Sequence, residues 1–390
     1  MISVEEALGR LFDLIHPLGS ENVSLRDAAG RWLAAPVTAQ RTQPPFDASS
    51  MDGYAVNAVE VEQHAQFKVI GEAAAGKGFS GRVGAGQAVR IFTGAPLPSG
   101  ADFVVIQEDV DRVGDLITVS ADTISKPNIR AAGSDFTKGT SFDPARALMP
   151  NDIALLAAMN HPTVSVQRKP VVAILPTGDE LVQPGETPGP DQIIASNSFG
   201  LAALLENAGA DVRLLPAAKD SVASLTRAFA LSQGADLVVT IGGASVGDHD
   251  LVGDVTDNLG MERSFYKIAM RPGKPLMAGK LGETALVGLP GNPVSAMVCG
   301  TIFILPMIRA MLGQPALPTP RATAPVTHDI GANGPREHYM RAHFGPDGLT
   351  IFDRQDSALL HLLTQANALA VRPVGDPART AGTEVEFILL

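Results

Sequence analysis

Three loops rich in glycine and proline each follow an apolar run that has the length of a buried strand. The loops span residues 176–180, 242–250 and 290–295, and the runs before them span 171–175, 237–241 and 285–289. Glycine lets backbone N–H groups approach an anion, and the N-terminus of a following helix adds about half a positive charge. Because ligands bind beyond the carboxyl ends of parallel strands, the three loops predict a pocket for a phosphorylated ligand.

Several side chains in these loops can bind charged partners. Glu180, Asp248 and Asp250 are carboxylates of the kind that hold a divalent cation beside phosphates. Ser245 and Ser295 are hydroxyl donors for an anion. The acids indicate metal-assisted phosphate chemistry rather than a covalent intermediate, because the chain has no GxSxG or cysteine-centred nucleophile motif.

Each of these features has a purely structural alternative. A single glycine-rich loop after a strand is usually only a turn, and Asp220 is more simply explained as the N-cap of a helix that ends near Leu231. None of the loops matches GxxxxGK[ST] or GxGxxG, which disfavours a P-loop or a Rossmann dinucleotide site. The recurrence of such loops at matching strand ends is what favours a ligand site.

The densest cluster of basic residues near these loops is YKIAMRPGKP at 266–275. Lys267, Arg271 and Lys274 are its cations, and the two prolines restrict where the side chains point. In an acidic protein such a cluster is an attractive oxyanion site. A solvated basic surface turn is the alternative, and the sequence alone favours neither.

Three further loops combine polar and turn-forming residues in an unusual density. They are PPFDASSMDGYA at 44–55, TGAPLP at 93–98 and NIRAAGSD at 128–135. In the first of them, composition favours a plain hairpin turn at Asp52–Gly53. All three flank or interrupt a β-rich stretch of the chain.

Composition excludes several classes of function. The 390 residues carry a formal charge of −11, which disfavours a general binder of nucleic acid or anionic membranes. The single cysteine, Cys299, rules out intramolecular disulfides, and the 8 histidines show no HExxH spacing. The N-terminus lacks the basic start of a signal peptide, and Pro306 and Arg309 interrupt the apolar stretch 296–312. We therefore expect a buried helix there and a soluble cytoplasmic protein.

The pattern of elements predicts an α/β multidomain chain. Strands alternate with helices in the middle of the chain, which indicates a parallel sheet with right-handed crossovers. The expected strands are 171–175, 212–215, 237–241 and 285–289, and the expected helices are 196–207, 220–231 and one from 294 onward. Before this domain, helices at 4–15, 25–35 and 147–159 flank β-rich sequence from 67 to 119, and the outer two helices are expected to pack together. After a linker at 317–320, the chain ends in a small β domain.

Eight motifs, in order along the chain, resemble the molybdopterin molybdenumtransferase family, also called MoeA, which includes the E domain of gephyrin. They are PPFDASSMDGYAV (44–56), TGAPLPSGADFVV (93–105), NIRAAGSD (128–135), LPTGDEL (175–181), SNSFGLAALL (196–205), TIGGASVGDHD (240–250), MRPGKPLMAGKL (270–281) and GLPGNPVSAM (288–297). Each motif is moderately specific, the set is highly specific, and the tail after residue 320 matches only loosely. Arg271 stands where lysine is also usual in the family.

The resemblance implies four parts for each protomer of an elongated homodimer. A helical part comprises 1–43 and 136–167, and a β-rich insertion comprises 44–135. Residues 168–315 would form the α/β molybdopterin-binding domain, which resembles the molybdopterin adenylyltransferases, and 316–390 a C-terminal β-barrel. The active cleft would lie where the α/β domain of one protomer meets the β insertion of the other.

The resemblance also implies an activity. The enzyme, a transferase, would insert molybdenum from molybdate into adenylylated molybdopterin and release AMP with Mg²⁺ present, downstream of a molybdopterin adenylyltransferase. On the insertion side the site residues carried over are Asp52, Thr93, Arg130 and Asp135. On the α/β side they are Glu180, Asp220, Ser245, Asp250, Lys267, Arg271, Lys274, Pro290, Pro293 and Ser295.

A division of roles among these residues follows as a hypothesis. Glu180, Asp220 and Asp250 would hold Mg²⁺ and the diphosphate-type linkage. The molybdate oxyanion would be bound by Lys267, Arg271, Lys274, Ser245 and Ser295, because a dianion needs several donors to replace its hydration. Asp52 and Thr93 would orient the ligand or the attacking group.

Two other functions remain open at this point. One is the adenylylation of molybdopterin, although a lone adenylyltransferase domain lacks the β insertion with its MDGYA motif. The other is a non-catalytic scaffold of the gephyrin E-domain type. An assay of ATP consumption with free molybdopterin separates the first from molybdenum insertion, and ligand binding without AMP release would indicate the second.

Overall fold

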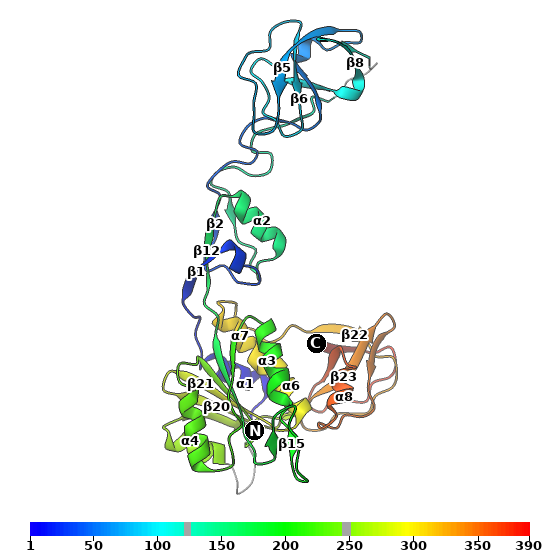
Figure 1. The fold of residues 1–390 in the computed structure, drawn as a ribbon. Coiled ribbons are helices and arrows are strands. Elements are labelled where there is room, and N and C mark those ends of the chain that lie inside the picture. The colour runs from blue at the N-terminus through cyan, green and yellow to red at the C-terminus, as the bar shows by residue number, and fades with distance from the viewer. Residues whose placement is uncertain (121–125, 244–250) are drawn as a thin grey trace. The chain divides into compact units, whose positions relative to one another are not determined.

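The computed structural model describes residues 1–120, 126–243 and 251–390 (Figure 1). The chain divides into two compact units. One unit comprises Met1–Glu21 and Gln167–Leu390, and the other comprises Asn22–Val166.

A six-stranded sheet forms the centre of the α/β domain, in the order β16-β13-β17-β21-β20-β18. These strands are β16 (Asp211–Leu214), β13 (Val171–Pro176), β17 (Leu237–Ile241), β21 (Thr284–Leu289), β20 (Pro275–Leu281) and β18 (Glu262–Lys267). The first four run parallel, which confirms the predicted α/β fold, and the last two are antiparallel. The antiparallel edge was not predicted, because β-bulges around Phe265 break the alternation of buried and exposed residues that identifies a strand.

Helices cover both faces of this sheet. On one face, α4 (Val222–Leu231) and α5 (Leu251–Asn258) bury Leu225, Phe229 and Val255 against the strands. Helix α3 (Asn197–Asn207) contacts β13 and packs against α6 (Pro293–Cys299). A π-helical segment, Gly300–Ile304, joins α6 to α7 (Leu305–Met311). The combined helix Pro293–Met311 is long and apolar enough to cross a membrane, but 89% of its most apolar window is buried inside the protein, as in a core helix.

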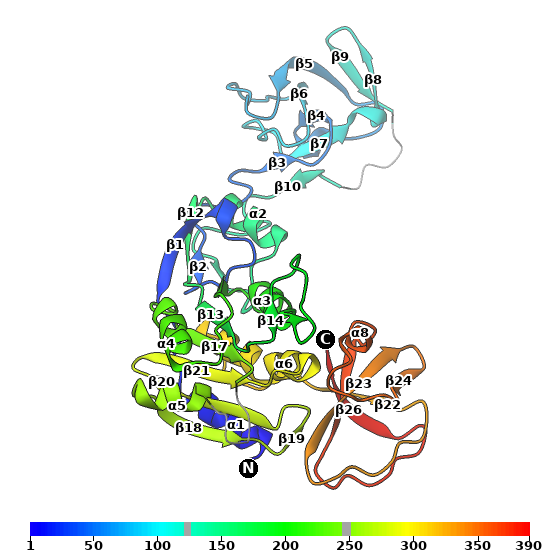
Figure 2. The ribbon, with the colours of Figure 1, turned by 60° about the horizontal axis from the view of Figure 1, so that its bottom comes forward.

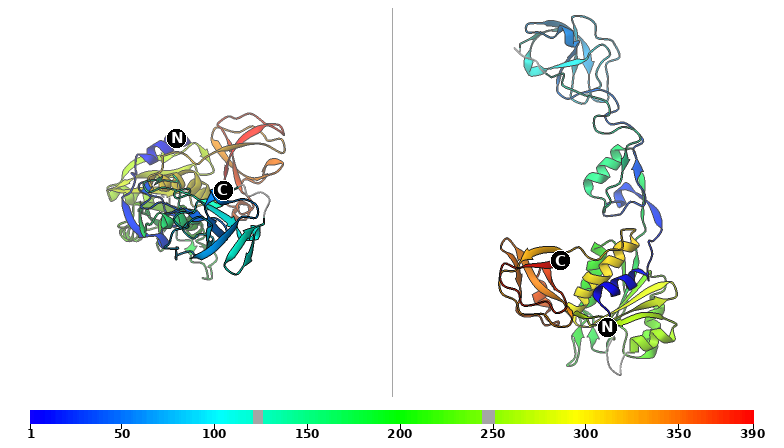
Figure 3. Two further views of the ribbon diagram at one scale, coloured as in Figure 1. Left: turned by 90° about the horizontal axis from the view of Figure 1, so that it is seen from above. Right: turned by 180° about the vertical axis from the view of Figure 1, so that it is seen from behind.

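The N-terminal helix belongs to the same unit as the α/β domain. Helix α1 (Val4–Phe12) begins after Ser3, whose hydroxyl accepts a hydrogen bond from the N–H of Glu6 at 3.0 Å. It packs against α7, and Figure 3 shows the two helices side by side. The helix near residue 150 on which α1 was expected to pack, α2 (Pro150–Ala158), belongs to the other unit.

The second unit contains the remainder of the predicted helical part and the β-rich insertion. Strand β1 (Ser20–Ser24) pairs with β12 (Thr163–Gln167), and β2 (Val37–Thr38) pairs with β11 (Ser141–Phe142). The helix expected at 25–35 is a single turn, Leu25–Asp27, because Gly30 takes a left-handed conformation with φ of 75°.

The insertion is a six-stranded sheet in the order β7-β4-β6-β5-β9-β8. Its strands are β4 (Gly53–Val56), β5 (Gln66–Ala73), β6 (Gln87–Ile91), β7 (Phe103–Ile106), β8 (Val110–Val113) and β9 (Leu116–Val119), and a separate short pair joins β3 (Ala48–Ser49) to β10 (Ile129–Arg130). Gly53 opens β4 between β6 and β7, so Asp52–Gly53 is the entry to an inner strand and not a hairpin turn.

The C-terminal domain is a small barrel beside α6 (Figure 2). Its strands are β22 (Ala322–Pro325), β23 (Glu337–Gly345), β24 (Gly348–Ile351), β25 (Ala368–Arg372) and β26 (Glu384–Leu389), and a short helix, α8 (Leu360–Leu363), precedes β25. The sheet closes because Val326, next to β22, bridges Leu349 in β24. One strand of the α/β domain, β19 (Met270–Arg271), pairs with the start of β23 and so joins the two domains.

We predict that Gly53→Ala destabilises the protein. A Cβ at Gly53 would overlap the carbonyl oxygen of Val105 in the neighbouring strand, and backbone cannot move aside cheaply. The control is Gly9→Ala in α1, where a Cβ has open space and alanine should stabilise the helix by about 0.5–1 kcal/mol. Urea unfolding measures both changes, and a Gly53→Ala protein as stable as the parent would contradict the prediction.

Candidate functional site

A cavity of about 650 Å³ lies at the carboxyl edge of the α/β sheet. The lining comes from residues within 176–181 and 193–198, from Gly242, Gly243 and 290–293, and from Asp220, Pro275 and Ala358. The loops after β13, β17 and β21 therefore meet at one cavity, in the arrangement that the sequence predicted.

The loop after β13 is tied to its neighbours through the backbone. The N–H of Thr177 donates to the carbonyl of Ile241 at 2.9 Å, and the N–H of Gly178 donates to Ala218 at 3.0 Å. Gly178 has φ of 145°, and a Cβ there would collide with the Glu180 carboxylate. Glycine thus lets the chain turn tightly enough to bring Glu180 into the cavity wall.

The loop after β17 needs glycine for the same reason. Gly242 and Gly243 both have positive φ, and a Cβ on Gly242 would come within 2.7 Å of the carbonyl oxygen of Thr177. The N–H of Gly242 donates to Leu289 at 3.0 Å, so this loop is bonded to β21. The rest of the predicted loop, with Ser245, Asp248 and Asp250, lies outside the residues that the structure describes.

The loop after β21 differs in part from expectation. Pro290 and Pro293 line the cavity, but Ser295 is 4% exposed and is not part of the lining. At the N-terminus of α6, Pro293 has no N–H and the N–H of Val294 donates to the carbonyl of Ser357 at 3.0 Å. The contribution of this helix N-terminus to anion binding stays a prediction.

Asp220 is not a helix N-cap. Ser221 takes that position, and its hydroxyl accepts from the N–H of Ser224 at 3.3 Å. The carboxylate of Asp220 lines the cavity instead, and the N–H of Asp220 donates to Asp179 at 3.2 Å. Partial burial, and then the charges of Asp179 and Glu180, raise the pKa of Asp220.

The donor set fits Mg²⁺ in its chemistry. In the described ranges, no three His, Cys, Asp or Glu side chains are arranged as a metal site by themselves. Mg²⁺, however, commonly binds through one or two carboxylates together with substrate phosphates and water. Glu180 and Asp220 in the cavity wall supply two such carboxylates, and the third predicted ligand, Asp250, is not among the described residues.

The basic cluster lies next to the cavity rather than in its lining. Pro275 lines the cavity, whereas Lys267, Arg271 and Lys274 do not. Lys267 ends β18, with its ammonium 5.3 Å from the centre of the Tyr266 ring. Arg271 is exposed in β19 and Lys274 is half-buried just before β20.

The predicted residues of the insertion are linked by hydrogen bonds. The N–H and the hydroxyl of Thr93 both donate to one oxygen of Asp52, each at 2.8 Å. These two bonds, and secondarily the charge of Arg90, lower the pKa of Asp52. Arg130 pairs with Ala48 in the β3–β10 ladder, so the motifs at 44–55 and 128–135 lie together.

Asp135 also bonds to the residue that precedes the motif at 44–55. Its N–H donates to the carbonyl of Gln43 at 3.1 Å, and its side chain is exposed. Arg130 is exposed as well, and both side chains remain proposed ligands.

Sequence reasoning missed several parts of the cavity wall. The short strands β14 (Leu181–Val182) and β15 (Ile193–Ile194) pair in parallel and bring two exposed isoleucines to the wall. Asn197 lines the cavity and donates to the carbonyl of Gly291 at 2.7 Å. Ala358 comes from the C-terminal domain, and no local sequence signal predicts that contact.

Three known families match the chain in succession. The MoeA N-terminal region (domain I and II) matches residues 2–160, and the MoeA C-terminal region (domain IV) matches residues 323–390. Between them, residues 173–310 match a probable molybdopterin binding domain.

Individual proteins are similar over most or all of the chain. The molybdopterin molybdenumtransferase of Nostoc sp. is 36% identical over 100% of this chain and 94% of its own length. The enzyme of the same name from Haemophilus influenzae is 37% identical over 80% of this chain and 78% of its own. The crystal structure of the molybdopterin biosynthesis MoeA protein of Pyrococcus horikoshii has a TM-score of 0.86 at 29% identity, and covers 100% of this chain and 99% of that one.

We predict that Thr93→Val raises the pKa of Asp52 toward its ordinary value. The substitution removes the hydroxyl that donates to the Asp52 carboxylate but keeps the backbone donor, so part of the depression should remain. Thr93→Ser keeps both donors and is the control. Carboxyl ¹³C chemical shifts followed against pH measure the change, and an unaltered Asp52 pKa in Thr93→Val would refute the assignment.

We also predict that His338 makes the folded state less stable in mild acid. The pKa of His338 is lowered to about 4, first by burial and then by the charges of Arg271, Arg336, Arg372 and Arg341. Unfolded histidine titrates near 6.5, so the unfolded state binds more protons between these values. Stability should therefore fall as pH falls from about 6.5 toward 4.

The test compares two variants on the same strand. His338→Gln should flatten this pH dependence of urea unfolding, whereas His343→Gln, at an exposed position of β23, should leave it unchanged. Equal slopes for the parent and His338→Gln would contradict the prediction.

Proposed function

Because this chain belongs to the molybdopterin molybdenumtransferase (MoeA) family, we propose that it inserts molybdenum from molybdate into adenylylated molybdopterin and releases AMP. The observation that carries the proposal is the cavity at which three loops of the family's motifs meet beside a cluster of cations. Such a cavity suits a ligand with both a phosphate linkage and an attached ring system.

The carboxylates give this cavity its proposed role at the diphosphate. Glu180 and Asp220 would hold Mg²⁺ between the protein and the phosphates, with Asp250 as the third proposed ligand. The cation would neutralise the phosphates and stabilise the leaving AMP. The raised pKa of Asp220 supports this assignment, since a cation relieves the repulsion among neighbouring carboxylates.

The basic cluster is the proposed site for molybdate. Lys267, Arg271 and Lys274 would supply charge-assisted hydrogen bonds to the oxyanion, next to a cavity whose wall includes Pro275. Ser245 is proposed as a further donor. Ser295 is the weakest member of the proposed set, since its side chain is buried. Pro290 and Pro293 would shape the cavity wall rather than donate bonds.

The residues of the insertion are proposed to act on the same ligand within a homodimer. In that arrangement Asp52, Thr93, Arg130 and Asp135 of one protomer would face the α/β cavity of its partner. The hydrogen bonds from Thr93 keep Asp52 ionised, which suits a group that orients an attacking group or a cation. We further propose a cytoplasmic location and a molybdopterin adenylyltransferase as the supplier of the substrate.

The other two functions are less well supported. The chain contains an insertion and a C-terminal domain in addition to the α/β domain, which an adenylyltransferase acting alone would not need. A scaffold would not need a carboxylate at the wall of a cavity, Asp220, whose pKa is raised by burial and by the neighbouring charges of Asp179 and Glu180. Molybdenum insertion uses all of these features.

The decisive experiment mixes the purified protein with adenylylated molybdopterin, molybdate and Mg²⁺. We expect AMP release that depends on molybdate and on the divalent cation. ATP consumption with free molybdopterin would indicate the adenylyltransferase instead, and ligand binding without AMP release would indicate a scaffold. Absence of AMP release from folded protein would overturn the proposal.

We predict that Glu180→Gln lowers the rate of AMP release by about 10²-fold or more, because it removes charge from the proposed phosphate and cation site without changing its shape. Glu206→Gln, at an exposed position of α3, is the matched control and should retain the parent rate. Thermal unfolding of both variants checks the fold. Near-parent turnover in Glu180→Gln would remove this residue from the mechanism.

A further inference from the structure

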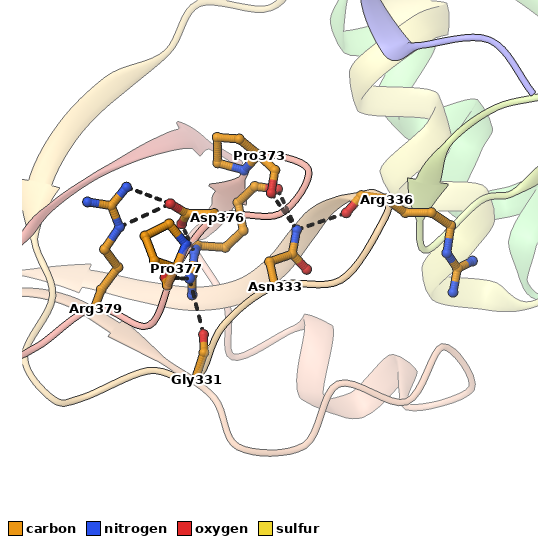
Figure 4. A network of polar contacts seen from close by, with 8 residues as sticks. Gly331, Asn333, Arg336, Pro373, Asp376, Pro377 and Arg379 are labelled. Atoms are coloured by element: carbon orange, nitrogen blue, oxygen red, sulfur yellow. Dashed lines mark hydrogen bonds and ion pairs between the residues drawn. The ribbon is translucent and has the colours of Figure 1, made fainter.

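A buried ion pair lies at one end of the C-terminal barrel, near the β19–β23 junction (Figure 4). Arg372 and Asp376 are 2% and 6% exposed, and the Arg372 guanidinium donates to the Asp376 carboxylate. Arg379 donates to the other oxygen of Asp376 from two nitrogens. Burying charges costs about as much free energy as their pairing returns. The presence of such a network is therefore weak evidence that it serves only to stabilise the fold.

Asn333 ties this ion pair to a second loop. Its side-chain amide donates to the carbonyls of Arg336, Arg372 and Pro373 at 2.8, 3.0 and 2.7 Å. The backbone of Asn333 donates to Asp376 at 2.8 Å. We call Asn333, Arg372, Asp376 and Arg379 the clasp, because together they bind the loop at 331–336 to the loop at 373–379.

Arg372 adds two bonds of its own to this connection. Its guanidinium donates to the carbonyl of Gly331 at 3.1 Å and to that of Pro377 at 2.8 Å. Each carbonyl lies in one of the two loops. The clasp therefore fixes the backbone immediately before β23, which begins at Glu337.

The start of β23 in turn holds the basic segment. Glu337 donates through its N–H to the carbonyl of Ala269 at 2.9 Å, and the Arg336 guanidinium donates to the carbonyl of Met270 at 3.5 Å. In Figure 4 the side chain of Arg336 extends away from the clasp, while its carbonyl faces Asn333. The backbone and side chain of one residue thus connect the two domains.

The register places the clasp and the basic segment in one row. Arg271 in β19 lies opposite His338 in β23, and His338 lies opposite Arg372 in β25. Strand β19 has only two residues and pairs with β23, so its position depends on that strand. A shift of β23 at this end would move Arg271 directly.

We propose that the clasp is a positioning network that fixes Arg271 and Lys274 at the spacing needed for a tetrahedral oxyanion. The inference rests on the proposed function, in which these two cations bind molybdate. Lys274 is included because its carbonyl accepts from the N–H of Ile268 at 3.1 Å, which folds the segment back on itself. The clasp residues touch no substrate and act through the backbone of β23 and β19.

The alternative is that the clasp only stabilises the barrel. Asn367 offers a matched control, because it braces the opposite end of the same strand. Its amide donates to the carbonyl of Phe344 at 2.9 Å and its oxygen accepts from the N–H of Phe344 at 2.7 Å. Asn333→Ala and Asn367→Ala therefore remove similar bonds from the two ends of β23, and only one end contacts the basic segment.

The experiment first measures hydrogen exchange of the full chain. Asn333→Ala should speed exchange at residues 267–275, whereas Asn367→Ala should leave that segment as in the parent. This readout needs no activity, so it tests the mechanical link even if the proposed function fails. Equal exchange of the segment in all three proteins would overturn the link.

The kinetic arm uses molybdate-dependent AMP release. Asn333→Ala should raise the KM for molybdate about tenfold and leave kcat at saturating molybdate within about twofold, because a small misplacement weakens oxyanion binding. Asn367→Ala should keep the parent KM even if it lowers the unfolding temperature. Parallel KM changes in both variants, or in neither, would overturn the proposal, while a parent protein without AMP release would refute the proposed function alone.

If Asn333→Ala does not fold, Arg379→Ala replaces it. Arg379 is the most exposed member of the ion pair network, and its loss leaves the Arg372–Asp376 pair intact. The same increase in exchange at 267–275 and in the KM for molybdate is expected, with smaller amplitude. Parent values of both quantities in folded Arg379→Ala would overturn the proposal.

Discussion

The direction of four parallel strands is the constraint on which the site depends. Parallel strands send their carboxyl ends to one edge of the sheet, so the loops after β13, β17 and β21 must meet there. Each loop is then bonded to the adjoining strand or loop, as Thr177 is to Ile241 and Gly242 to Leu289. The positive φ values of Gly178 and Gly242 let the backbones approach that closely. The position of the cavity is therefore a consequence of sheet topology, and the side chains that line it determine its chemistry.

The second feature of the site is the separation of opposite charges around one cavity. Carboxylates enter from the loop after β13 and from the segment before α4, whereas the cations lie in the connection between β18 and β20. The C-terminal domain approaches the same region through β19–β23 pairing and through Ala358. In the proposed function, the carboxylates would act on the phosphate linkage and the neighbouring cations on the oxyanion.

Much of this could be predicted from the sequence because the signals are local. Apolar runs such as 171–175 and 237–241 identified the buried strands, and the family resemblance from eight motifs is confirmed by relatives that cover the whole chain. The antiparallel edge escaped prediction because bulges disturb its alternation, and Ala358 escaped because it approaches from a separate domain. The burial of Ser295 could not be predicted, because a motif does not reveal which face of α6 is buried. The roles of the site residues, and the limits of the domains, stay predictions.

The helix α4 has its N-cap at Ser221, one residue after Asp220, and this difference changes the structural role of the Asp220 carboxylate. Had Asp220 been the N-cap, its oxygen would have been used by a backbone N–H of α4, and its charge would have been stabilised by the helix. Ser221 makes that bond instead, and leaves the Asp220 carboxylate beside the charges of Asp179 and Glu180. Like charges beside a carboxylate raise its pKa, because they make its ionised form less stable. A bound cation would relieve this repulsion. Helix formation does not require this arrangement, whereas the proposed binding of a divalent cation beside a phosphate would give it a role.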